Sequence, residues 1–145
     1  MKQPISVRQS IGTLSEIMQH VTQHKDLPAR ITAMRENDTK AMRSFCQIAF
    51  GPVDMFADIR ETGFTPDYRC RLENVASTES FFGVVQALER ITDKARNMRL
   101  RQDALNDILD WLHPNEAKII LSIFNHQTLI PGLPLVVVRS VYPNL

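Results

Sequence analysis

The run from Asn106 to Leu121 reads NDILDWLHPNEAKIIL and holds two helical patterns separated by one break. On each side of the break, apolar residues recur three and four positions apart, as on one face of an α-helix. The pair His113-Pro114 ends the first pattern and begins the second, because proline suits a first helical turn, where its missing N–H would be unbonded anyway. Glu116 follows in that turn, where the positive end of the helix dipole favours an acid. The run therefore predicts two helices joined by a tight turn.

The same spacing extends over most of the chain. Near the N-terminus, Thr13-Leu14-Ser15-Glu16 is a capping box, and it begins a helix expected to end near His24. Further helices are expected from Pro28 to residue 36, from residue 40 to Phe50, from Val53 to Glu61, from the Ser77–Ser80 cap to about Arg96, from Leu100 to Leu112 and from Pro114 through Phe124. The least helical stretch is Gly63 to Asn74, where Thr65-Pro66-Asp67 is typical of a turn.

The last segment, Leu135 to Tyr142, contains three consecutive valines and favours a strand by propensity. No other segment offers a strand to pair with it, so we predict a short buried helix instead. The expected fold is thus a single all-α domain over residues 1–145, made of seven or eight short helices, with residues 1–12 as an irregular lead-in.

Composition limits the classes of function. The chain has 145 residues, 43% of them hydrophobic, and a net charge of +1, which suits one compact core but not a dedicated nucleic-acid binder. No apolar run approaches the roughly 20 residues that span a membrane, and the N-terminus has no apolar leader. Cys46 and Cys70 are the only cysteines, and we expect both to be reduced. We therefore expect a soluble protein, neither secreted nor membrane-bound.

No pattern indicates catalysis. Glycine-rich phosphate loops and a nucleophile elbow are absent. Asp103, Asp107 and Asp110 lie on the polar side of an amphipathic helix, which is typical of a solvated face. His20 and His24 stand four apart, as in a helical metal pair, but no third ligand is indicated. We predict no enzyme activity, no cofactor, no metal and no small-molecule substrate.

One basic cluster stands apart from this background. Lys94, Arg96, Arg99 and Arg101 fall within eight residues that contain no acid. Cations near a helix end can simply complement the helix dipole. Alternatively, the cluster is a patch that contacts phosphates, which Arg69 and Arg71 would extend if the fold brings them near.

The C-terminal half carries a resemblance. Residues 106–121 are followed by Leu129, Gly132, three valines and Tyr142-Pro143-Asn144-Leu145. This pattern resembles the end of the N-terminal helical DNA-binding domain of ATP-dependent DNA ligases, especially those of T-even-like phages. It is also similar to small tailed-phage proteins that consist of the pattern alone. The likeness extends from about Thr13 to Leu145.

The resemblance implies an all-α domain that lies along the minor groove of duplex DNA and contacts backbone phosphates. Gly132 matches the glycine of a loop that brings backbone amides to phosphate, and Arg139 falls in the following helix. Pro131 and Pro134 flank that glycine and lack N–H donors, so the loop offers fewer contacts. No lysine of the chain has the Lys-x-Asp-Gly context of ligase nucleotidyl transfer, so the chain is not expected to be a ligase.

These observations lead to two functional hypotheses. The first is a non-catalytic phage accessory protein that binds duplex DNA, or docks onto a DNA-processing complex, in the host cytoplasm. Its predicted phosphate contacts are Lys94, Arg96, Arg99 and Arg101, with Arg139 as a weaker candidate. The alternative is a virion head or tail component, or another protein-interaction module that binds a phage or host protein. Its expected contact points are Phe64, Met98 and Tyr142.

Overall fold

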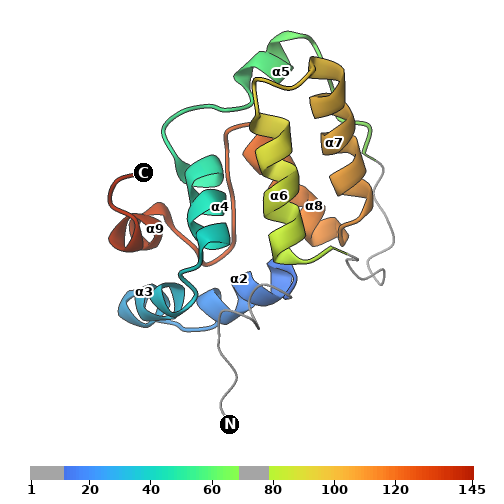
Figure 1. Cartoon of the computed structure of the whole chain (residues 1–145). Coiled ribbons are helices and arrows are strands. Elements are labelled where there is room, and N and C mark those ends of the chain that lie inside the picture. The colour runs from blue at the N-terminus through green and yellow to red at the C-terminus, as the bar shows by residue number, and fades with distance from the viewer. Residues whose placement is uncertain (1–11, 69–78) are drawn as a thin grey trace.

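The computed structural model describes residues 12–68 and 79–145. Within these ranges every regular element is an α-helix (Figure 1), so the all-α prediction is confirmed. The described residues form eight helices: α2 (Leu14–Thr22), α3 (Leu27–Glu36), α4 (Lys40–Phe50), α5 (Ala57–Glu61), α6 (Phe81–Thr92), α7 (Met98–Asp110), α8 (Pro114–Phe124) and α9 (Leu135–Val141).

Side-chain caps set most helix starts. Thr13 Oγ1 accepts a hydrogen bond from the Glu16 amide at 3.2 Å, and the Glu16 carboxylate accepts one from the Thr13 amide at 3.4 Å. The predicted capping box is therefore confirmed. Ser80 Oγ likewise accepts from the Gly83 amide at 3.0 Å at the start of α6. Each cap satisfies an amide that has no partner within its own helix.

Two helices are shorter than predicted, and an aspartate explains each case. The helix expected to reach Arg96 ends at Thr92, and the helix expected from Val53 begins only at Ala57. Asp93 Oδ1 accepts from the Ala95 amide at 3.0 Å, and Asp54 Oδ1 accepts from the Phe56 amide at 3.2 Å. Such turns bind the amide two residues ahead and so compete with helical hydrogen bonds.

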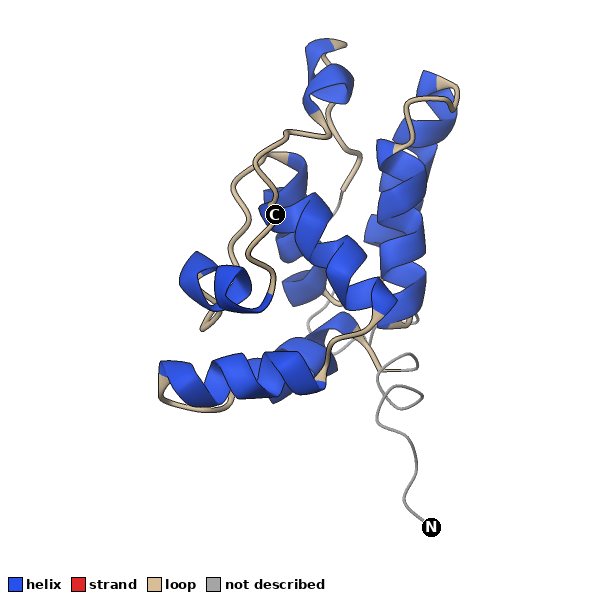
Figure 2. Ribbon diagram, turned by 60° about the vertical axis from the view of Figure 1, so that its left-hand side comes forward, coloured by secondary structure: helices blue, strands red, loops and turns tan. Residues whose placement is uncertain are grey.

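The core lies between the α6–α7 hairpin and the remaining helices (Figure 2). Helix α6 contacts α7, α4 and α2, while α9 contacts α3 and α4. Phe81 of α6 meets Phe45 of α4 with ring centroids 5.4 Å apart. Val137 and Val138 of α9 are fully buried. Burial of these valines against α3 and α4 outweighs their weak helix propensity, and the predicted terminal helix is confirmed.

A buried acid ties distant parts of the chain together. Glu116 is 1% exposed, and its Oε2 accepts a hydrogen bond from the Ser15 amide at 2.5 Å. The sequence assigned Glu116 only to the dipole of its own helix. In the structure its carboxylate also holds the first turn of α2 against the first turn of α8.

Candidate functional site

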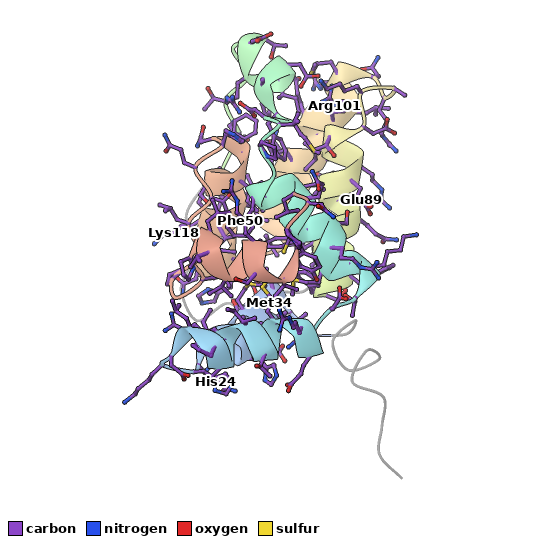
Figure 3. All side chains as sticks on the ribbon, turned by 90° about the vertical axis from the view of Figure 1, so that its left-hand side faces the viewer. His24, Met34, Phe50, Glu89, Arg101 and Lys118 are labelled. Carbon is purple, nitrogen blue, oxygen red and sulfur yellow. The ribbon has the colours of Figure 1, made fainter. Side chains whose placement is uncertain are left out.

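Arg101 does not belong to the exposed basic cluster, contrary to the prediction. Its residue is 2% exposed, and Figure 3 shows it where α5 and α7 meet. Its Nε donates to the Ile91 carbonyl at 2.7 Å, while its two terminal nitrogens donate to the Asp58 carboxylate at 2.7 and 3.1 Å. The hydrogen bond from Arg101 lowers the pKa of Asp58. A guanidinium held in this way has a structural role, and it does not reach a phosphate outside the protein.

The other three cations of the cluster are exposed around the start of α7. Lys94 and Arg96 lie in the turn after α6, and Arg99 lies in the first turn of α7. Arg99 Nε pairs with Asp103 at 3.1 Å, with side chains 81% and 51% exposed. An exposed pair of this kind contributes less than about 1 kcal/mol, so these cations stay accessible to a partner. The fold nevertheless sets Asp93 and Asp103 beside them, which reduces the local positive charge.

The remaining predicted phosphate contacts lie elsewhere. Gly132 has φ +81°, and a Cβ placed there would lie 3.0 Å from Thr22 Cβ. A tight turn against the end of α2 therefore explains this glycine without a phosphate. Arg139 is exposed in the last turn of α9, on the opposite side of the molecule from the α6–α7 turn (Figures 1 and 2). Arg69 and Arg71 lie outside the described residues.

The apolar contact points expected for an interaction module also change. Phe64, Met98 and Tyr142 are half-buried and pack against the core. The Tyr142 hydroxyl donates to Asp38 at 2.8 Å. The large apolar residues that the described surface does expose on the α6–α7 hairpin are Phe82, Leu100 and Trp111.

A groove between α6 and α7 gathers two of these residues. The groove is a hollow of about 580 Å³. Small residues from both helices line it, namely Gly83, Ala87 and Ala104. Leu100 and Trp111, 53% and 54% exposed, lie at its two ends along α7. A shallow channel with small residues along it and large apolar residues at both ends is suited to another protein surface. We call it the hairpin groove.

The charges of the hairpin groove are separated by sign along its length. Because α6 and α7 are antiparallel, Arg90 and Arg96 lie near the connecting turn, whereas Glu79 and Asp107 lie near the other end. Asp103 is between them and pairs with Arg99. A Cβ placed on Gly83 would lie 1.9 Å from Glu79 Oε1, so the Glu79 carboxylate occupies the space above this glycine. The groove is thus polar in a directional sense, and not uniformly basic.

The sequence analysis missed this groove. Leu105 and Leu109 form the buried side of α7, and they were expected to face inward. Leu100, Ala104, Asp107 and Trp111 repeat at intervals of four, three and four residues on the other side. That spacing is typical of a second helix-packing seam. It could have identified the groove, but Trp111 was assigned to the core or to a neighbouring helix, and Asp107 to a solvated face.

Among residues 12–68 and 79–145, no helix is both long and apolar enough to cross a bilayer. Comparisons of the chain with protein-family models, with curated proteins and with solved structures gave no match. Fold and surface together define an all-α domain with an exposed groove between two antiparallel helices.

Proposed function

We propose that this chain is a non-catalytic interaction module that docks onto a protein through the hairpin groove. The observation that carries the proposal is the groove itself, in which small residues separate the exposed Leu100 and Trp111. Interfaces are enriched in aromatic side chains at their centres and rimmed by polar groups. The hairpin groove has both features.

The charges of the groove favour a protein over a polyanion. A surface that attracts nucleic acid presents one sign of charge. Here the carboxylates of Glu79, Asp103 and Asp107 line the same hollow as two arginines. Phosphates would be repelled along much of the groove, whereas a protein surface can match both signs. The resemblance of residues 106–145 suggests a setting in a phage DNA-processing complex or in a virion head or tail.

Site-specific photo-crosslinking tests this proposal. A photo-reactive amino acid replaces Leu100 or Trp111, and in a control it replaces Thr32, which is exposed on α3. After irradiation in cells that naturally contain the chain, we expect discrete protein adducts from positions 100 and 111 and none from position 32. Equal labelling from all three positions, or none from the groove, would refute docking at this surface.

A second candidate function, contact with duplex DNA, is favoured by one observation. Lys94, Arg96 and Arg99 are exposed around the N-terminus of α7, and the first turn of this helix contains no acid. The positive end of a helix and neighbouring cations together attract phosphate. Such contacts would engage the DNA backbone without reading its sequence.

Salt-dependent DNA binding tests the second candidate. The variant replaces Lys94, Arg96 and Arg99 by glutamine, and a charge-matched control replaces three exposed lysines elsewhere, namely Lys25, Lys40 and Lys118. Each phosphate contact contributes about 0.9 to the slope of log affinity against log salt. We expect the slope to fall in the variant and to persist in the control. Equal slopes in wild type and variant would exclude this function.

A further inference from the structure

The hairpin groove is self-complementary, which identifies an occupant for it. Arg90 is near the turn end of the groove and Glu79 is near the other end. A two-fold axis lying in the groove face, perpendicular to the helices, exchanges the two ends. We propose that the groove is filled by a second copy of this chain, with α6 against α6 and α7 against α7 in antiparallel pairs. This inference rests on the proposed docking function and specifies its partner.

The apolar residues obey the same symmetry. Leu100 and Trp111 stand eleven residues apart on the outward side of α7, which is about 16 Å along the helix. An antiparallel second α7 that sets Leu100 against Trp111 of the second copy does so twice, once at each end. In a symmetric dimer each contact between two different residues necessarily occurs twice.

The charged and apolar pairings require the same axis. In the antiparallel hairpin Arg90 is level with Leu100, Ala87 with Ala104, and Glu79 with Trp111, as their shared lining of the groove indicates. A rotation that pairs Leu100 with Trp111 of the second copy therefore also pairs Arg90 with Glu79 of the second copy. The small residues Gly83, Ala87 and Ala104 lie between these pairs. They permit the helix axes to approach at the short end of the usual 8–10 Å range.

The charges also select the orientation. A parallel arrangement would set the Arg90 residues of the two copies near each other, and likewise the Glu79 residues. Like charges opposed in this way disfavour that arrangement. One feature opposes the antiparallel dimer: the axis passes close to Asp107, so the Asp107 carboxylates of the two copies approach each other. The arrangement therefore predicts that neutralising Asp107 strengthens the dimer.

A charge-exchange experiment tests the proposal. Sedimentation equilibrium over a wide concentration range measures self-association of the wild type, of Arg90→Glu, of Glu79→Arg and of their equimolar mixture. We expect wild type to dimerise and each single variant to be at least tenfold weaker. The mixture should form heterodimers, because both cross-copy pairs are again of opposite sign. Asp107→Asn should dimerise more tightly than wild type, and Gln19→Arg, on exposed α2, should match it.

Circular dichroism of each variant checks that the helices are intact, since Glu79 also accepts a hydrogen bond from the Ser80 amide at 3.2 Å. A wild type that stays monomeric at every concentration, or a mixture no better associated than its components, would overturn the proposal. The crosslinking experiment separates the two inferences. Groove adducts with a different protein, from a chain that is monomeric, would refute the second copy and leave docking intact.

Discussion

The ion pair between Arg101 and Asp58 gives the sharpest stability prediction. Asp58→Ala removes the carboxylate that receives both terminal guanidinium nitrogens, at 2.7 and 3.1 Å. Arg101 is 2% exposed and keeps only its hydrogen bond to the Ile91 carbonyl. Breaking a buried pair on one side costs about 3–5 kcal/mol. Because the Asp58 side chain is 32% exposed, water can reach the vacated side, and we expect a loss of about 2–3 kcal/mol.

A double-mutant cycle separates the pair from its surroundings. Arg101→Met replaces the cation by an apolar chain of similar length and leaves Asp58 open to water. It should cost about 1–2 kcal/mol through the lost bond to Ile91. In that background Asp58→Ala should cost much less than it does alone, giving a coupling energy of about 2 kcal/mol.

Urea unfolding followed by circular dichroism measures these free energies. The Asp58→Ala loss corresponds to a melting temperature lower by about 5–10 °C for a chain of this length. Asp103→Ala is the matched control, since it removes an exposed arginine–aspartate pair at 3.1 Å and should cost under about 1 kcal/mol. If Asp58→Ala were as mild as Asp103→Ala, the assignment of Arg101 to the core would be refuted.

Three further predictions concern acid stability, backbone strain and the buried thiol. Hydrogen bonds from Arg101 and Arg60 lower the pKa values of Asp58 and Asp54 in the folded state. Their stabilisation is therefore complete above the unfolded value near 3.9 and is lost as the pH falls through the folded values. The free energy of unfolding measured across this acid range should decline more steeply in wild type than in the double variant Asp54→Asn, Asp58→Asn, and parallel declines would contradict the assignment. Gly132→Ala should destabilise more than Gly63→Ala in thermal melts: both glycines have φ near +80°, but only the first new Cβ meets a neighbour, Thr22. Similar losses at both glycines would argue against close packing of this loop on α2. Burial raises the pKa of the Cys46 thiol to about 12, so in a Cys70→Ser variant a thiol reagent should react at the rate of unfolding near neutral pH. Fast reaction under native conditions would show that Cys46 is accessible.

Local chemistry made much of the fold predictable. The Thr13 capping box, the His113-Pro114 break and the apolar periodicity of α4, α6 and α8 depend on residues within four positions of one another. Such short-range interactions are encoded directly in the sequence. The same short range explains why the ends of α6 and α5 were less accurate, since the Asp93 and Asp54 turns compete closely with another helical turn.

The candidate site was less predictable, because it depends on partners distant in the chain. Lys94, Arg96, Arg99 and Arg101 look alike in sequence, yet the last is withdrawn by Asp58, 43 residues away. The hairpin groove likewise exists only because α6 and α7 pack antiparallel and leave one side of α7 uncovered. The sequence by itself determined that the chain is helical and where most helices begin. Only the tertiary structure decided which cation is buried and which apolar stripe stays exposed, because those outcomes depend on contacts between elements and not on any local pattern.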